Sequence, residues 1–506
     1  MATEIELKLA IAPDDVPRLR RSESLKTAAG GKPVTRTLHN IYFDTAERDL
    51  AQRGMALRLR KAGRQWIQTF KCGGGSDGGL HLRSEFETVV RSPVLDLTAL
   101  AATPAAALFA DAAFLAQLGP AFVTRFRRTT WIVALAPGET AEVALDQGQV
   151  TAGTASTPIS EVEIELLEGD PARLFDFAQR LLVEVPLRLE NVTKAERGYR
   201  LLAPVEAAPV RASSVVLQAD MRVPQAFATV ALGCVHQLQA NERGVLESDD
   251  PEYIHQARVA LRRLRSAFGI FRDAIPRERS AVLVERLRTL GNGLGGARDW
   301  DVFSTETLPP VEAAMPGSAV LASVRKAADE RRLHARRIAQ EAIASTSYTA
   351  LLLDLVAMLV ALARPAEPVS DAKEEALPKF ARDAIAKREK RVRRAGKALA
   401  VTDLPALHAL RIEAKKLRYA TEFFQALLPR KAVKAGIASA ADLQEILGRV
   451  NDAAVTGDLL AALRQDDANL SHGTGIVLGW TQARACLALE HFDAAWARFA
   501  KSRRAR

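Results

Sequence analysis

The sequence has little cysteine and few aromatic side chains. Its 506 residues contain 3 cysteines, at Cys72, Cys234 and Cys486, far apart and in no metal-ligand pattern. A set this sparse argues against a disulfide framework and is typical of a reducing compartment. Aromatic residues make up 6% of the chain, and none alternates with the basic stripes of its second half. The stacking surfaces that single-stranded nucleic acids need are therefore missing, which disfavours nucleic acid as a partner.

A long apolar run is also missing. Charged and apolar residues alternate from Glu4 onward, which leaves no room for the apolar core of a signal peptide. The most hydrophobic stretch, 350–363, is interrupted by Asp354 and is shorter than the roughly 20 residues of a membrane-spanning helix. These absences predict a cytoplasmic protein without membrane contact.

Charge is unevenly placed along the chain. Of 70 lysines and arginines and 60 acids, residues 1–210 hold 25 and 26, which leaves 45 and 34 for the rest. The net charges of the two parts are therefore −1 and +11. An excess of this size predicts a polyanionic partner for the second part, although a basic surface also serves solubility alone.

Periodicity divides the chain at the same place. Residues 1–203 read mostly in period two, as strands do, and residues 218–500 read in period 3.6, as helices do. The segment 204–217 has little pattern and is predicted to be a linker. A second loose segment, 364–377, divides the helical part into halves at about 218–365 and 375–500. A chain of this length is expected to form two or three domains.

Charged residues repeat on one face of several predicted strands. Side chains alternate across a strand, so Glu4 shares a face with Glu6, and Glu161 with Glu163 and Glu165. Like charges two residues apart repel unless a cation lies between them, and Mg²⁺ and Mn²⁺ prefer carboxylate oxygens. Paired arginines elsewhere supply the forks that bind phosphate. Each face alone could be a solvated surface, but a closed barrel with both sets inside would bind metal and phosphate.

The ordered set of these motifs resembles the CYTH family, the triphosphate tunnel metalloenzymes. The matching blocks are Glu4-x-Glu6-x-Lys8, Tyr42-Phe43-Asp44-Thr45, Leu57-Arg58-Leu59-Arg60, Thr69-Phe70-Lys71, Arg83-x-Glu85-x-Glu87, Arg125-x-Arg127, Asp146 with the Glu161 strand, and Thr193-Lys194-Ala195-Glu196-Arg197. The resemblance implies an eight-stranded antiparallel barrel over 1–203, whose tunnel binds triphosphate with Mg²⁺ or Mn²⁺.

The same resemblance implies a role for each charged residue of the motifs. The candidate metal ligands are Glu4, Glu6, Asp146, Glu161, Glu163 and Glu165. The candidate phosphate contacts are Lys8, Arg58, Arg60, Lys71, Arg83, Arg125, Arg127 and Lys194. Among these, Glu4, Glu6, Lys8 and Lys71 are the candidate catalytic residues.

The helical part contains an internal repeat with an offset of 153 residues. A basic stripe of one predicted helix, His255, Arg258, Arg262 and Arg265, recurs as His408, Arg411, Lys415 and Arg418. Seen once, such a stripe is usually a solvated face; its recurrence predicts a site formed by two related helices. Asp299 and Asp452 also correspond, and each follows a glycine-containing turn, so both are predicted to cap helices. A further basic run, Arg388 to Arg394, is predicted to have no facing helix.

These repeats resemble the CHAD domain, an α-helical domain often fused to CYTH. The resemblance implies a duplicated all-α bundle over 218–500 that binds inorganic polyphosphate through both stripes, so the whole chain is a multidomain α+β protein. A metal role for His255 and His408 is disfavoured because the surrounding cations would repel a metal ion.

The combined resemblance implies an inorganic triphosphatase of the bacterial type. Such an enzyme hydrolyses triphosphate, or short polyphosphate, to diphosphate and phosphate, and association with polyphosphate granules would follow. Two other enzymatic activities remain open within CYTH, adenylyl cyclase and hydrolysis of thiamine or nucleoside triphosphates. A non-enzymatic polyphosphate-binding scaffold is a further alternative.

Overall fold

The computed structural model describes residues 2–204, 207–364, 375–397 and 399–501. They fall into two compact units. Unit 1 comprises Met1–Ala207 and Thr349–Met358, and unit 2 comprises Ala208–Tyr348 and Leu359–Arg506. Each unit is considered by itself below.

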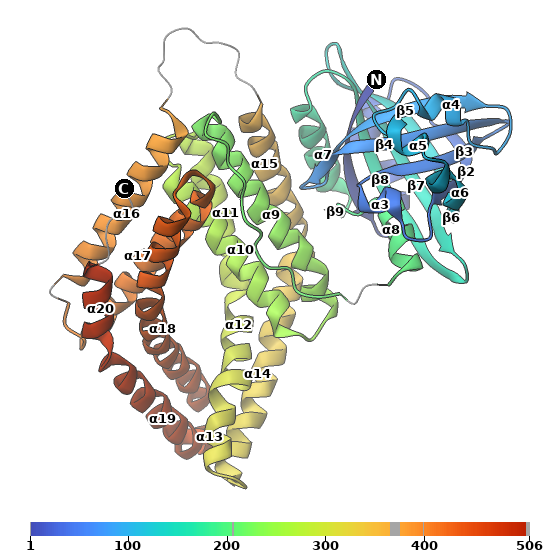
Figure 1. Cartoon of the computed structure of the whole chain (residues 1–506). Helices are drawn as coiled ribbons and strands as arrows, with labels where there is room; N and C mark the ends of the chain where they lie inside the picture. The colour runs from blue at the N-terminus through green and yellow to red at the C-terminus, as the bar shows by residue number, and fades with distance from the viewer. Residues whose placement is uncertain (1, 205–206, 365–374, 398, 502–506) are drawn as a thin grey trace. The chain divides into compact units, whose positions relative to one another are not determined.

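Unit 1 is built on an antiparallel β-barrel (Figure 1). Its strands are β1 (Ala2–Ile11), β2 (Val34–Asp44), β3 (Ala56–Ala62), β4 (Gln65–Asp77), β5 (Leu80–Val90), β6 (Gly119–Ala136), β7 (Glu139–Ala152), β8 (Ala155–Glu168) and β9 (Leu187–Leu189). Eight of them pair in the order β5-β4-β3-β2-β6-β7-β8-β1, and pairing of β1 with β5 closes the ring. The short β9 adds to the end of β1. The predicted eight-stranded antiparallel barrel is confirmed.

The alternation of apolar and charged side chains along β1 determines which residues face the inside of the barrel. Leu7 and Leu9 are 0% exposed and point away from the lumen, on the side where helix α7 (Ala172–Glu184) packs against β1. Glu6 and Lys8 take the opposite face and line the lumen. The other helices of this unit are α1 (Val16–Arg21), α2 (Glu23–Ala28), α3 (Asp49–Gln52), α4 (Leu97–Leu100), α5 (Ala106–Phe109) and α6 (Ala112–Gln117).

Helix α8 (Lys194–Leu202) packs against the inside of the barrel wall. A capping box starts it, because the Thr193 side chain accepts from the Glu196 N–H while the Glu196 side chain accepts from the Thr193 N–H. Phe122 packs edge-on against Tyr199 of α8. Gly198 is required at this contact, because a Cβ there would lie 2.2 Å from the Phe122 ring. The capping box therefore places Lys194 at the first helical position, facing the lumen.

Unit 2 is helical. Its helices are α9 (Val223–Glu247), α10 (Pro251–Ile270), α11 (Arg277–Gly293), α12 (Gly295–Val302), α13 (Leu308–Ala314), α14 (Ala319–Ala344), α16 (Leu377–Gly396), α17 (Leu404–Phe423), α18 (Arg430–Asp466), α19 (Ser471–Leu489) and α20 (Phe492–Lys501), with α15 (Thr346–Ala363) divided between the units. A π-helical segment, Phe303–Thr307, joins α12 to α13.

The predicted repeat appears in the helices themselves. Shifting α10 by 153 residues reproduces the bounds of α17. Both begin with the same chemistry, since the side chains of Asp250 and Asp403 accept backbone N–H bonds and a proline lies in each first turn. Phe271 and Phe424 correspond under the shift, and their ring centroids lie 5.5 Å apart. The two halves therefore share one core.

Helix α15 corrects an expectation about the apolar stretch. The helix begins at Thr346, which gives an 18-residue segment of mean hydropathy 1.8, enough by length and composition to cross a membrane. The expectation that it is too short is therefore wrong. Within the structure 56% of this segment is buried, and a buried core helix of a soluble protein has the same length and composition. The loose segment 364–377 lies mostly outside the described residues.

Candidate functional site

The barrel lumen contains a cavity of about 60 Å³ lined by charged residues. Nine residues predicted from the motifs line it: Glu4, Glu6, Lys8, Arg58, Arg60, Lys71, Arg83, Glu163 and Lys194. They come from β1, β3, β4, β5, β8 and α8. Segments far apart in the sequence therefore converge on one small space.

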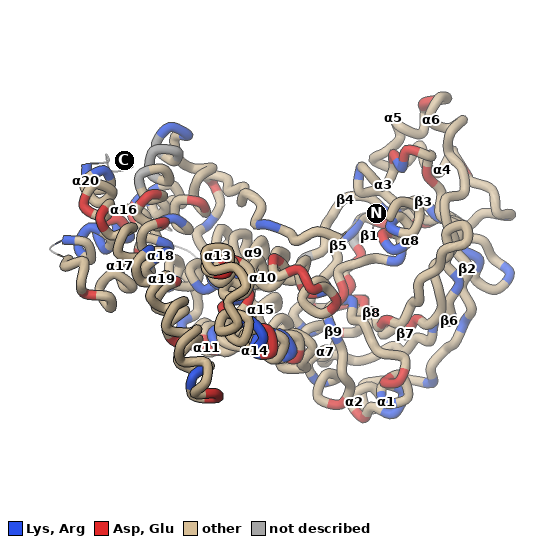
Figure 2. The backbone as a smooth tube through the Cα atoms, turned by 90° about the horizontal axis from the view of Figure 1, so that it is seen from below, with Lys and Arg blue, Asp and Glu red and all other residues tan. Residues whose placement is uncertain are grey.

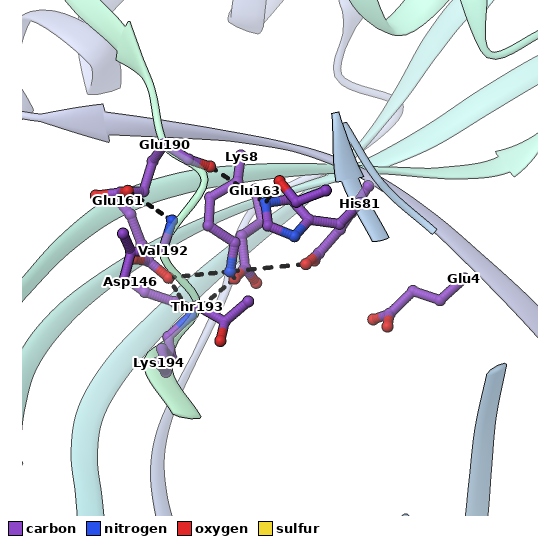
Figure 3. A network of polar contacts seen from close by, with 12 residues as sticks. Glu4, Lys8, His81, Asp146, Glu161, Glu163, Glu190, Val192, Thr193 and Lys194 are labelled. Carbon is purple, nitrogen blue, oxygen red and sulfur yellow. Dashed lines mark hydrogen bonds and ion pairs between the residues drawn. The ribbon is translucent and has the colours of Figure 1, made fainter. Parts of the chain in front are cut away.

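Three of the predicted metal ligands form a buried cluster beside this cavity. Ligand atoms of Asp146, Glu161 and Glu163 lie within 4.8 Å of one another. The ammonium of Lys194 lies among them, at 2.6, 2.5 and 2.8 Å from their carboxylate oxygens. Lys8 adds a contact of 2.6 Å to Glu163. Figure 3 shows both ammonium groups inside the cluster. These carboxylates are already neutralised by cations.

An arginine that the motifs did not single out completes the cluster. Arg128 donates to both oxygens of Asp146, at 2.8 and 2.6 Å, and also to Glu163. Burial alone would raise the pKa of Asp146, but Arg128 and Lys194 outweigh it and hold that pKa below its usual value. A divalent cation in this cluster would have to displace Lys194.

A second group of carboxylates has few cationic partners. Burial, and then repulsion by Glu4, Glu6 and Glu142, raise the pKa of Glu165 to about 7. Glu4 pairs with Lys71 at 2.5 Å and Glu6 with Lys8 at 3.6 Å, whereas Glu165 forms no ion pair within the described residues. Figure 3 shows Glu4 apart from the buried cluster. Excess negative charge among carboxylates is what a divalent cation relieves. The charge balance therefore favours Glu4, Glu6 and Glu165 as metal ligands, whereas the spacing of the carboxylates favours Asp146, Glu161 and Glu163.

The basic side of the lumen is suited to phosphate. Arg58 contacts the Tyr42 hydroxyl and Glu85, each at 3.5 Å. Arg60 donates to Asn40 at 3.2 Å. Burial, and then the charges of Arg58 and Arg128, lower the pKa of Arg60 to about 10. An arginine crowded by other cations is strongly stabilised by an incoming anion.

Arg125 and Arg127 lie outside this site. Both are exposed, and alternation along β6 puts them on the outer surface of the barrel, while Phe126 and Arg128 line the lumen. The assignment of these two arginines to the tunnel is therefore wrong, and Arg128 takes that place. The sequence shows that Arg128 shares a face with Phe126, but it does not show which face of β6 lines the lumen.

Unit 2 contains a much larger cavity, of about 920 Å³. Six residues of the predicted stripes line it: His255, Arg258, Arg262, Arg265, Arg411 and Lys415. Two do not. His408 is exposed and lies 3.1 Å from the side-chain oxygen of Asn451. Arg418 lines a neighbouring cavity of about 330 Å³, together with Arg411 and Lys415.

The lining of the large cavity is strongly basic. It includes 11 lysines and arginines against four acids, which are Asp273, Asp299, Glu306 and Asp452. Burial, and then repulsion by Arg411 and Arg262, lower the pKa of Lys415 to about 7. Burial and Arg298 also lower the pKa of His255. Cations crowded enough to discharge an amine near neutral pH favour a polyanionic ligand.

Two sequence expectations for this region are wrong. Asp299 lies inside α12 and Asp452 inside α18, so neither caps a helix. Both line the cavity instead, and burial, with a smaller contribution from the Asp452 carboxylate, raises the pKa of Asp299. The basic run of α16 does face other helices. Arg388 donates to the Gly269 carbonyl of α10 at 2.9 Å, and Lys387 and Arg391 line the same cavity.

The fold and its two sites define a class of protein. One part is a barrel with acidic and basic side chains in its lumen, and the other is a duplicated helical region around a basic cavity. Residues 2–199 match the CYTH domain family and residues 229–461 match the CHAD domain family. The chain is therefore a CYTH domain followed by a CHAD domain, as its motifs predicted.

Individual relatives match each part. The inorganic triphosphatase of Haemophilus influenzae is 34% identical over 208 residues, which are 40% of this chain and 55% of that protein. The uncharacterized protein MT2285 of Mycobacterium tuberculosis is 28% identical over 423 residues, covering 76% of this chain and 75% of its own length. The crystal structure of the CHAD domain from the plant Ricinus communis covers 59% of this chain and 99% of its own, with 32% identity and a TM-score of 0.53. The chain thus spans about half the length of the curated triphosphatase that it matches.

Proposed function

We propose that the barrel hydrolyses inorganic triphosphate, or short polyphosphate, to diphosphate and phosphate. The observation that carries this proposal is the convergence of Lys8, Arg58, Arg60, Lys71, Arg83 and Lys194 with stacked carboxylates in one closed lumen. The named activity of the Haemophilus influenzae relative supports it for the barrel part. The divisions 1–203, 204–217 and 218–500 are proposed as the boundaries of barrel, linker and helical domain.

The residues of the lumen divide the chemistry between them. Arg58, Arg60 and Lys71 would bind and orient phosphoryl oxygens, and their charge would stabilise the transition state. Glu4, Glu6 and Glu165 would hold Mg²⁺ or Mn²⁺, which when bound neutralises charge on the phosphate chain. A lumen carboxylate would accept the proton of the attacking water while the anhydride bond to diphosphate breaks. Lys8 and Lys194 would hold the buried acids in place.

The size of the lumen favours a small inorganic substrate over a nucleotide. Pockets for drug-sized ligands measure about 300–1,000 Å³, whereas the cavity here measures about 60 Å³. A base and ribose would need space that this lumen lacks. Hydrolysis of triphosphate is therefore preferred over cyclisation of ATP or hydrolysis of thiamine triphosphate.

We further propose that the helical domain binds inorganic polyphosphate in its large cavity. The basic lining and its volume of about 920 Å³ support a polyanion larger than triphosphate. Such binding would place the protein in the cytoplasm on polyphosphate granules. A scaffold without enzymatic activity is the less economical alternative, because it would leave the paired acids and bases of the lumen without a role.

The proposed activity is tested by measuring phosphate release from triphosphate, longer polyphosphate, ATP and thiamine triphosphate, with Mg²⁺ and with a chelator. Triphosphate is expected to give the highest kcat/KM, and only with the metal. Arg60→Ala should lower that value at least tenfold, because a charge-assisted contact is worth roughly 1.5–3 kcal/mol. A higher kcat/KM for ATP or thiamine triphosphate would contradict the substrate assignment.

A further inference from the structure

The Arg125-x-Arg127 motif is left without a role once its side chains are placed outside the barrel. These two arginines belong to a row of basic side chains that crosses three strands. On the outer surface, Lys61 of β3 pairs in register with His39 of β2, and His39 pairs with Arg125 of β6. Arg127 follows one step further along β6. Cationic positions along β6 are visible in Figure 2.

Among the residues that the structure describes, no acidic side chain pairs with this row. In the part of the chain that the structure describes, Lys61, Arg125 and Arg127 form no ion pair. The strand segments that build this surface contain no Asp or Glu at all: 28–43, 53–76, 119–138 and 147–160. Burial, and then the charges of Arg125 and Lys61, lower the pKa of His39 between them. Like charges gathered on one face of a sheet repel one another, so the row is better explained by an anionic ligand than by stability.

The row also lies on the wall that carries the inner phosphate contacts. Side chains alternate across a strand, so Lys61 is the outward neighbour of Arg60, and Arg127 of Arg128. The lumen, at about 60 Å³, has room for only a short phosphate chain. If the barrel acts on the end of a longer chain, the remainder must lie outside it.

We propose that Lys61, Arg125 and Arg127 form a second polyanion-binding surface, which holds the part of a long polyphosphate that does not enter the lumen. Backbones in this row lie about 5 Å apart across neighbouring strands and about 7 Å apart along β6, so an extended chain can contact Lys61 on β3 and both arginines on β6. The choice of polyphosphate rests on the function proposed for the lumen. Single-stranded nucleic acid needs free aromatic rings on which its bases can stack. The ring beside this row, Trp66 of β4, is already covered by the Lys61 ammonium, which disfavours nucleic acid as the ligand.

The test uses the full chain with Arg258, Arg262, Arg411 and Lys415 replaced by glutamine, so that the large helical cavity contributes little to binding. In this background Arg125→Gln with Arg127→Gln should weaken long-polyphosphate binding about tenfold. The slope of log affinity against log salt should become shallower by about 1.5, as expected for two lost phosphate contacts. In the otherwise unchanged chain, the same pair should leave kcat/KM for triphosphate as it is.

Arg20 and Arg21 provide the matched control. Both are exposed on α1, and neither forms an ion pair within the described residues, so Arg20→Gln with Arg21→Gln makes the same change of charge elsewhere on unit 1. Equal losses from both pairs would mean that only bulk charge matters, and a larger effect on duplex DNA than on polyphosphate at equal salt would indicate nucleic acid. Either result overturns the proposal. Absence of triphosphate hydrolysis in the parent protein would instead contradict the lumen's function while leaving the binding comparison decisive.

Discussion

Glu165 carries charge that the protein alone does not balance. Its pKa of about 7 exceeds the usual value of 4.5 because of burial and the nearby Glu4 and Glu6. Below the unfolded-state pKa of about 4.5, the carboxyl is protonated in both the folded and the unfolded protein, so it costs no stability. Between about pH 4.5 and pH 7 it ionises in the unfolded state first, so the free energy of unfolding falls, and above about pH 7 the full loss of stability is present. A divalent cation between these carboxylates removes the cost.

We therefore predict that Glu165→Gln stabilises the metal-free protein at about pH 8 but not at about pH 5. The same variant should show a smaller gain in melting temperature on addition of Mg²⁺, because one ligand is lost. Thermal melts in chelator and in Mg²⁺ measure both effects. Glu168→Gln, on an exposed residue of the same strand, is the control, and an Mg²⁺ gain in Glu165→Gln as large as in the parent would contradict the metal assignment.

Lys415 is expected to make the proposed polyphosphate binding sensitive to pH near neutrality. Its pKa of about 7 means that the amine is largely charged below that pH and neutral above it. A bound polyanion raises the pKa again, so binding between about pH 7 and pH 9 takes up a proton and weakens as pH rises. The other titratable groups facing this amine are Arg262 of α10, Asp452 of α18, and Arg411 and Arg418 of α17.

The repeat supplies the matching substitution for a test. Arg262 occupies the position of Lys415 in the first copy, and an arginine stays charged throughout this range. Lys415→Arg should keep the affinity of the parent at about pH 6 and lose most of the decline toward about pH 8.5. Affinity for long polyphosphate, titrated at constant salt, is the measurement. An identical decline in parent and variant would show that Lys415 does not cause it.

At the scale of single elements, the sequence predicted which residues share a face of a strand better than it predicted how neighbouring strands pair. The acidic and basic strand faces were visible because period two is simple, and β1 carries its charges on the lumen side as expected. In β6 the run Arg125-Phe126-Arg127-Arg128 offers arginines on both faces. Only pairing with β2 and β7, which sequence alone does not show, decides that Arg128 meets Asp146.

Helix ends were misread for a related reason. A glycine-containing turn before Asp299 and Asp452 is typical of a cap, but Leu294 caps α12, and α18 runs unbroken from Arg430 to Asp466. The tertiary packing of the two repeats, which buries Leu294 and Leu447, overrides the local turn signal there. The offset of 153 residues, by contrast, was predicted correctly, because it reflects the duplication and does not depend on how the helices pack.

Helix α16 provides a test of which basic side chains matter. All four side chains are exposed, but Lys387 and Arg391 line the large cavity, whereas Lys390 and Arg394 on the same helix do not. Replacing Lys387 and Arg391 by glutamine should weaken polyphosphate binding at least tenfold, since each removes a contact worth roughly 1.5–3 kcal/mol. The pair Lys390→Gln and Arg394→Gln makes the same change of charge and should cost less than about threefold. Direct titration with long polyphosphate distinguishes them, and equal losses would show that the face of α16 is irrelevant.

Across the whole molecule, the two units differ in how they balance charge. In the barrel, acids and bases are interleaved, and cations such as Arg128 and Lys194 already hold carboxylates. In the helical unit the cavity has 11 cations and four acids. An interleaved site suits a small anion that arrives with a metal ion, and a site of one sign suits a long anion without one. With the functions proposed for the two units, turnover of triphosphate and retention of polyphosphate should therefore be separable.

That separation leads to the last prediction. Replacing Arg258, Arg262, Arg411 and Lys415 by glutamine in the full chain should remove most binding of long polyphosphate, because all four line the helical cavity. Hydrolysis of triphosphate, measured with saturating Mg²⁺, should change by less than about twofold, since no lining residue of the lumen is altered. Hydrolysis of long polyphosphate should fall with the binding and lose its steep dependence on salt. A parallel loss of triphosphate turnover in a variant that still melts cooperatively would show that the helical cavity acts on the chemistry and not on retention alone.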